Sequence, residues 1–168
     1  MIHVYSYFSP LGKMLLAAEE RELIGVWFEG AKYFASGLDR DSCSTEKNAV
    51  LCHARDWLDA YFEGRRPDPN ALPLRLTGSS FRLSVLRSLL TIPYGETVTY
   101  GTIAKRLAVD SGRRASAQAV GGAVGHNPIS VIIPCHRVLG ADGGLTGYAG
   151  GVERKRLLLL HEAGQPLL

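Results

Sequence analysis

The stretch VIIPCHRV, from Val131 to Val138, places a histidine and an arginine directly after a cysteine. A cysteine attacks as a thiolate. Because a free thiol has a pKa of about 8.5, few thiolates exist at neutral pH, and a nearby base or positive charge has to help form them. His136 and Arg137 could provide that help to Cys135. The stretch therefore predicts an enclosed, anionic and nucleophilic sulfur.

An imidazole that acts as a base needs a carboxylate to orient it, and three acids follow His136 as candidates. Asp142 lies in ADGG, which is typical of an exposed turn. Glu153 begins a predicted helix, where its charge suits the helix dipole. Glu162 ends the apolar stretch LLLLHE, where an acid opposes the dipole and lies close to core residues. We select Glu162 as the orienting acid; the alternative is a surface acid at a frayed helix end.

The segments around the thiol indicate how it is positioned. Residues 131–133 are apolar and β-branched and predict a short buried strand, which Pro134 ends because proline cannot donate to a ladder. Asparagine side chains bond to nearby backbone, so we expect Asn127 to fix the segment that carries Cys135. The later glycine-rich loop LTGYAGG contains Tyr148 and could wall a flat pocket, or it could be an ordinary flexible connector.

Three helices are predicted before this segment. Ser79 or Ser80 can cap the first and Thr99 the second, and after the polar loop DSGRRA, Ser116 can cap the third. The second and third helices, joined by a basic loop, predict a helix-turn-helix. As a sequence signal this is weak, because many helical hairpins bind nothing.

The third helix, residues 116–124, consists mostly of alanine and glycine. Glycine costs a helix about 1 kcal/mol relative to alanine, so this composition needs a reason. Small residues let another backbone approach the helix closely. That backbone could belong to the protein's own sheet or to DNA. Reading bases in the major groove needs long polar side chains, and only Gln118 is long. A smooth helix suits the minor groove, so such a protein would bind DNA almost without regard to sequence.

Charge and pattern divide the chain into two parts. Residues 1–78 hold 9 Lys/Arg against 11 Asp/Glu, whereas residues 79–168 hold 10 against 5. A basic half indicates a polyanionic partner. In the first part, residues 2–28 predict β-hairpins and residues 45–63 predict an amphipathic helix, with the linker candidate RRPDPNALP after it. We expect a small α/β unit that supports the second part.

The composition, with 46% hydrophobic and 21% charged residues among 168, is ordinary for a globular domain. No apolar run approaches the roughly 18 residues of a membrane span, and the N-terminus lacks a secretory signal, so we expect a cytoplasmic protein without membrane contact. In reducing cytosol its three cysteines should be free thiols. Cys43 and Cys52 do not have a usual zinc spacing, so no metal site is expected.

Several motifs together resemble the O6-alkylguanine-DNA alkyltransferases, also called methylated-DNA–protein-cysteine methyltransferases. The motifs are Asn127-Pro128, PCHRV from Pro134 to Val138, GYAGG from Gly147 to Gly151, and His161-Glu162. The similarity covers about Ser79 to Gly164 and is only general over the first 75 residues. It implies a ribonuclease-H-like α/β domain over residues 1–75 and a winged-helix domain over residues 76–168.

The resemblance implies DNA repair without a cofactor. Such a protein takes the alkyl group of O6-alkylguanine, or of O4-alkylthymine, irreversibly onto its own cysteine, so each molecule acts once. It implies binding of double-stranded DNA through the minor groove with the damaged base flipped out of the stack. A monomer is the default expectation.

The resemblance also implies a role for each site residue. The catalytic set is Cys135 as acceptor, His136 as a water-linked base, Glu162 as the acid that orients it, Asn127 as the hinge, and Tyr100 as donor of a proton toward guanine N3. The residues implied in substrate or DNA contact are Gln118, Arg137, Val138, Tyr148, Ala149, Lys155, Arg113, Arg114 and Ser116. Among these, the backbone near Val138 and Ala149 lines the guanine pocket with Tyr148, and Lys155 lies at its rim.

One departure from the family is Gln118, because members often carry an arginine there that fills the gap left by the flipped base. A glutamine can hydrogen-bond the orphaned cytosine, but it has no charge and less bulk, so we expect weaker stabilisation of the flipped state. Arg113 and Arg114 could supply phosphate contacts instead.

Three rival functions remain open at this point. They are a thiol hydrolase that turns over repeatedly, a non-enzymatic binder that flags lesions, and a winged-helix transcription factor. The featureless third helix argues against the last, and the presence of Cys135 argues against the second.

Overall fold

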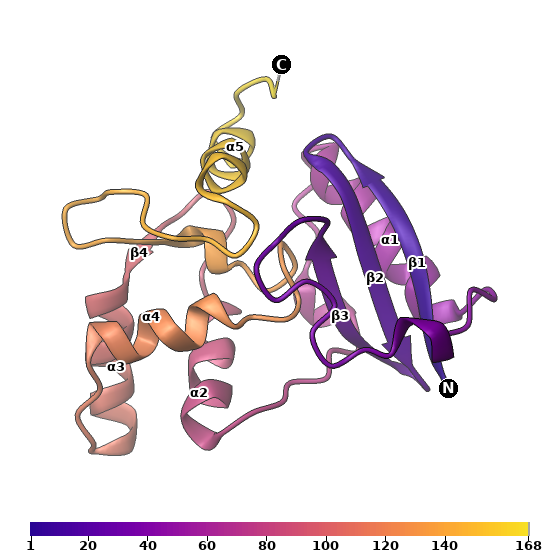
Figure 1. Ribbon diagram of the computed structural model, residues 1–168. Helices are drawn as coiled ribbons and strands as arrows, with labels where there is room; N and C mark the ends of the chain where they lie inside the picture. The colour runs from indigo at the N-terminus through magenta and orange to yellow at the C-terminus, as the bar shows by residue number, and fades with distance from the viewer. Residues whose placement is uncertain (168) are drawn as a thin grey trace.

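The first part of the chain is a three-stranded antiparallel sheet in the order β1-β2-β3, packed against one long helix (Figure 1). The computed structural model describes residues 1–167. The elements are β1 Ile2–Ser9, β2 Gly12–Glu19, β3 Glu22–Phe28 and α1 Ala49–Phe62. The predicted hairpins and helix are confirmed. The helix begins at Ala49 rather than near residue 45, because the Asn48 side chain accepts hydrogen bonds from the amides of Val50 and Leu51 and caps it.

Both faces of this sheet are covered. Met14 and Leu16 on β2 belong to the core that α1 shares, whereas Leu15 and Trp27 face a smaller cluster that Phe34 covers. This division follows from the alternation of side chains along a strand. Strand β3 lies at the edge of the sheet, and its free edge contacts the second part of the chain.

The second part consists of helices and one short parallel strand pair. Ser79, Thr99 and Ser116 cap the first three helices through their side-chain oxygens, which confirms the predicted caps. None of the helices within residues 1–167 combines the length and the hydrophobicity that crossing a membrane requires. The elements are α2 Ser80–Leu89, β4 Val98–Thr99, α3 Tyr100–Ser111, α4 Ala117–Gly125, β5 Val138–Leu139 and α5 Val152–Glu162, with a short 3-10 helix at Cys135–Arg137. Two further 3-10 helices, Arg40–Ser42 and Pro69–Ala71, precede this part of the chain.

The two parts share one hydrophobic core and meet along β3. The amide of Val26 donates to the carbonyl of Pro128, and the amide of Ser130 donates to the carbonyl of Val26, both at 2.9 Å. On the same strand, the amide of Leu23 donates to the carbonyl of Pro73 at 2.8 Å. The sheet thereby anchors both the linker and the segment that carries the thiol.

Residues 131–133 form a buried turn, so the predicted strand is wrong. Val131 has φ 70°, a left-handed conformation that β-branched residues rarely adopt. The amide of Ile133 donates to the carbonyl of Ile129 at 3.1 Å, which closes the turn. A buried turn and a buried strand select the same apolar side chains, so composition alone does not separate them.

Candidate active site

Glu162, at the end of α5, is buried and accepts hydrogen bonds from several parts of the chain. His136 Nε2 lies 2.5 Å from Oε2, and Arg137 donates from Nε to Oε1 at 2.7 Å and from Nη2 to Oε2 at 3.1 Å. The Tyr61 hydroxyl donates to Oε2 at 2.7 Å, and the Gly95 amide donates to Oε1 at 3.0 Å. Although burial alone raises the pKa of this carboxyl, hydrogen bonds from His136 and Arg137 lower the pKa of Glu162 overall. The acid is therefore ionised.

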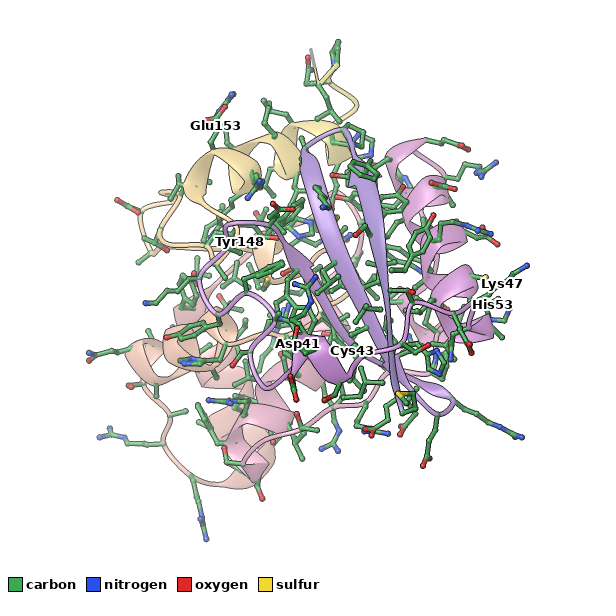
Figure 2. The ribbon with its side chains drawn as sticks, turned by 45° about the vertical axis from the view of Figure 1, so that its right-hand side comes forward. Asp41, Cys43, Lys47, His53, Tyr148 and Glu153 are labelled. Atoms are coloured by element: carbon green, nitrogen blue, oxygen red, sulfur yellow. The ribbon has the colours of Figure 1, made fainter. Side chains whose placement is uncertain are left out.

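The other two candidate acids lie away from the imidazole. Glu153 projects from the outer surface of α5 (Figure 2) and forms an exposed ion pair with Arg156. Asp142 is exposed and accepts a hydrogen bond from the Gly144 amide at 2.8 Å, within the predicted turn. Glu162 is thus the acid that pairs with His136, as selected from the sequence.

The His136 imidazole is held as a neutral base. Burial lowers its pKa, and the opposing effect of Glu162 does not restore the ordinary value. An ionised carboxylate can only accept a hydrogen bond, so Nε2 carries the ring proton and Nδ1 carries the lone pair. Within residues 1–167, Nδ1 is buried and has no hydrogen-bond partner. The geometry therefore leaves one ring nitrogen free to accept a proton.

The Cys135 thiol is 5% exposed. Burial raises its pKa, and the Asn127 side chain, the charge of Lys155 and the Tyr148 hydroxyl oppose this only in part. Burial therefore favours the neutral thiol in the resting protein, which is the opposite of the anionic sulfur expected from the sequence. The same three groups favour the thiolate and would stabilise it once a base removes the proton.

Asn127 fixes the turn that leads to the thiol. Its Nδ2 donates to the carbonyls of Ile133 at 2.9 Å and Ile129 at 3.3 Å, and its Oδ1 accepts from the Ile129 amide at 3.0 Å. These contacts join the two ends of the turn and satisfy backbone groups of Ile129 and Ile133. The fixing contact predicted for Asn127 is confirmed, and it explains why residues 131–133 need no strand partner.

Of the residues expected around a guanine pocket, Lys155 and Tyr148 act on the Cys135 thiol. Lys155 is fully buried rather than at a rim, and its Nζ donates to the Thr146 carbonyl at 3.0 Å and lies 5.8 Å from the centre of the Tyr100 ring. The Tyr148 hydroxyl is enclosed and makes no hydrogen bond with residues 1–167. The Ala149 carbonyl accepts from the Lys32 amide at 2.9 Å, so the first part of the chain holds this loop. Val138 is buried in β5.

Arg137 does not face a DNA surface, and its assignment to DNA contact is wrong. Besides Glu162, its guanidinium bonds the Ile92 carbonyl at 2.7 Å, and the residue is 7% exposed. Sequence reasoning also missed Tyr61, which reaches Glu162 from α1. The available signal was a tyrosine on the apolar face of a helix, since a buried tyrosine hydroxyl usually finds a partner.

Among the elements of residues 1–167, helix α4 packs mainly against α2 and α3, so packing on the protein's own sheet is not the main reason for its glycines. A Cβ at Gly122 or Gly125 would meet nothing within 4 Å, and one at Gly121 would meet only the Tyr100 ring, at 3.8 Å. Gln118 is exposed near the start of this helix. The small residues thus leave an open, smooth face.

A basic cleft of about 760 Å³ lies between α2, α3 and the loop before α4. Arg87, Arg106, Arg113 and Arg114 line it, and none of them forms an ion pair within residues 1–167. Ser116 is also exposed, and its hydroxyl accepts from the Ala119 amide at 3.0 Å. The unpaired positive charge is suited to a polyanion.

No group of three or more His, Cys, Asp or Glu side chains within residues 1–167 could hold a metal ion. Cys43 and Cys52 are free thiols and partly exposed, as is expected for residues without a bridging role.

Both parts of the chain match domains of one family. Residues 80–164 match the 6-O-methylguanine DNA methyltransferase DNA binding domain, and residues 2–76 match the ribonuclease-like domain of the same family. These matches confirm the predicted fold class, an α/β ribonuclease-like domain followed by a helical DNA-binding domain.

Individual relatives belong to the same family. A methylated-DNA–protein-cysteine methyltransferase from Mycobacterium bovis is 43% identical over 159 residues, which are 95% of this chain and 91% of that protein. The crystal structure of Mycobacterium tuberculosis O6-methylguanine methyltransferase has a TM-score of 0.83 at 42% identity, covering 99% of this chain and 95% of that one. A crystal structure of Mycobacterium tuberculosis OGT in complex with DNA has a TM-score of 0.82 at 41% identity, covering 98% and 95%. The chain therefore belongs to the O6-methylguanine DNA methyltransferase family, and its function is the repair of O6-methylguanine in DNA by methyl transfer to a protein cysteine.

Proposed function

We propose that Cys135 is the alkyl acceptor and that His136, oriented by Glu162, is the base that activates it. The thiol proton moves to Nδ1 of His136, directly or through a water molecule. The sulfur forms a bond to the alkyl carbon, the bond between that carbon and guanine O6 breaks, and its electron pair stays on guanine. The observation that carries this proposal is the bond between Nε2 and an ionised Glu162, which leaves Nδ1 unprotonated.

The environment supports this order of events. The neutral imidazole can take the proton, and the Glu162 carboxylate then stabilises the imidazolium. Asn127, Lys155 and Tyr148 favour the thiolate as it forms. The thioether product is stable, so the transfer is irreversible and each molecule acts once. No cofactor takes part.

Tyr100 donates a proton toward guanine N3, which offsets the charge on the leaving base; its half-buried position at the start of α3 is compatible with this role. The backbone of Val138 and Ala149 with Tyr148 forms the guanine pocket. O4-alkylthymine is the second substrate, because it presents an alkyl group on an equivalent exocyclic oxygen. Both bases have to leave the duplex, since the thiol is enclosed.

The open face of α4 enters the minor groove, with Gln118 beside the space that the flipped base vacates. Ser116, Arg113 and Arg114 contact phosphates next to it. The exposure of these residues and the unpaired arginines of the basic cleft support this orientation. We place the domain boundary between residues 75 and 76, and the protein acts as a monomer in the cytoplasm.

The test is to incubate the protein with duplex DNA containing O6-methylguanine and to weigh the intact protein. We expect one adduct of about 14 Da, the mass that replacing one hydrogen by one methyl group adds to the nucleophile. The Cys135→Ser variant should stay unmodified. Repeated turnover without an adduct would instead support a thiol hydrolase and overturn the proposal.

A further inference from the structure

Tyr61 links the supporting domain directly to the acid of the active site. Its hydroxyl lies on α1 and donates to Oε2 of Glu162 at 2.7 Å, and the same oxygen lies 2.5 Å from Nε2 of His136. Tyr61 is fully buried, so water does not compete for this bond. The other groups that donate to Glu162, from His136, Arg137 and Gly95, all belong to the second domain.

We propose that Tyr61 is a positioning residue of the transfer reaction, whose hydroxyl fixes the Glu162 oxygen that orients His136. The supporting domain then contributes to the rate of transfer as well as to stability. This inference rests on the proposed roles of His136 and Glu162.

The surroundings of Tyr61 leave its hydroxyl little freedom. Its carbonyl is hydrogen-bonded to Nε2 of His161 at 2.7 Å. Its ring stacks on the Trp57 ring, with 5.8 Å between the ring centroids. It packs edge to face against the rings of Tyr94, at 5.9 Å, and His136, at 6.5 Å. Because packing fixes the Tyr61 ring on several sides, its hydroxyl can hold the Glu162 carboxylate in one orientation. Tyr61 is therefore arranged to hold Glu162 Oε2, which is a more specific task than filling space.

Removing the hydroxyl would also change the charge balance at His136. Without this donor, Oε2 offers more negative charge to the imidazole, so His136 becomes easier to protonate. The other charged or titratable groups that act on His136 and Glu162 stay in place; they are Arg137, Lys155 and Tyr94. Removing the Tyr61 hydroxyl should therefore raise the pKa of His136, so that the neutral base is lost at a higher pH.

The experiment compares Tyr61→Phe with Tyr7→Phe in the full-length protein. Tyr7 is a matched control, because its hydroxyl also donates to a carboxylate, Asp59 Oδ1, at 2.7 Å in the same domain, yet does not contact Glu162. With methylated duplex in excess, the first-order rate constant of methyl transfer is measured from pH 5 to pH 9, a range of about two units on each side of neutrality. Because each molecule acts once, the final extent of transfer counts the molecules that are competent to react.

We expect Tyr61→Phe to transfer about tenfold more slowly, which corresponds to the loss of one hydrogen bond to a charged group. Its acid limb should also move to higher pH. Tyr7→Phe should stay within about twofold of the native rate, with no displacement of the limb. Equal rates and equal pH profiles for the two variants would overturn the inference.

A double-mutant cycle separates this inference from the proposed function. If Tyr61 acts through Glu162, then Tyr61→Phe should have little further effect on the rate in a Glu162→Gln background. Additive effects of the two changes would show that Tyr61 acts by another route and overturn the inference alone. A Glu162→Gln protein that transfers at the native rate would instead overturn the proposed role of the acid.

Discussion

The buried guanidinium of Arg137 should determine stability, not DNA affinity, and Arg137→Met tests this. Methionine keeps much of the length and apolar volume of the side chain. The substitution removes the donors to both oxygens of Glu162 and the donor to the Ile92 carbonyl. Removing one partner of a buried ion pair costs about 3–5 kcal/mol. In a chain of this length, each kcal/mol lowers Tm by about 2–4 °C. Thermal unfolding followed by circular dichroism should therefore show a Tm about 6–20 °C lower.

The matched control is Arg114→Met, which removes an exposed arginine beside α4. We expect its free energy of unfolding to change by no more than about 0.5 kcal/mol. Its affinity for duplex DNA should fall, and the slope of log K against log salt should decrease by about one, as for the loss of one phosphate contact. Folded Arg137→Met should keep the native affinity and the native slope.

The opposite pattern would refute this reasoning. If Arg137→Met kept the native Tm but bound duplex DNA with a reduced salt slope, then Arg137 would contact phosphate and the buried ion pair would not exist in solution.

Further predictions follow from α4 and from the buried pair. Gln118→Arg should tighten binding to methylated duplex, measured by fluorescence anisotropy, and an unchanged affinity would contradict the placement of Gln118. Gly122→Leu should fold normally, because the space around Gly122 is open, but should bind DNA more weakly; native affinity would mean that α4 does not enter the groove. The rate of transfer should fall on the acid side only below pH 6.5, since burial lowers the pKa of His136 from that ordinary value; a midpoint above it would contradict the neutral base. Stability should also decrease as pH falls below about 6.5, because the pKa values of His136 and Glu162 are both lowered by folding and their contributions are present only above the unfolded values.

Local chemistry made several features predictable from the sequence. The caps at Ser79, Thr99 and Ser116 are side chains that bond within one helical turn, so their signal is local. Glu162 was selected because an acid at an apolar helix end needs a partner, and the structure supplies His136 and Arg137.

Features that depend on distant contacts were not predictable in the same way. Tyr61 lies 101 residues from Glu162, and only the packing of the two domains brings them together. The contact with substrate or DNA that the family resemblance implies for Arg137 is wrong, because its guanidinium pairs with the buried carboxylate of Glu162, 25 residues away. Residues 131–133 have the composition of a strand, and the Asn127 side chain, which bonds the two ends of the turn, gives no periodic signal that would distinguish the two. The raised pKa of the Cys135 thiol comes from its burial, which depends on the packing of the whole domain and has no local sequence signal.

The most direct test of the central claim is to add increasing amounts of methylated duplex and to count methyl groups on each cysteine by peptide mass spectrometry. If Cys135 is an irreversible acceptor, methylation should reach a plateau of one group per molecule on the Cys135 peptide, with none on Cys43 or Cys52, however much DNA is added. Continued removal of methyl groups from DNA beyond that plateau, or an adduct on another cysteine, would contradict the account.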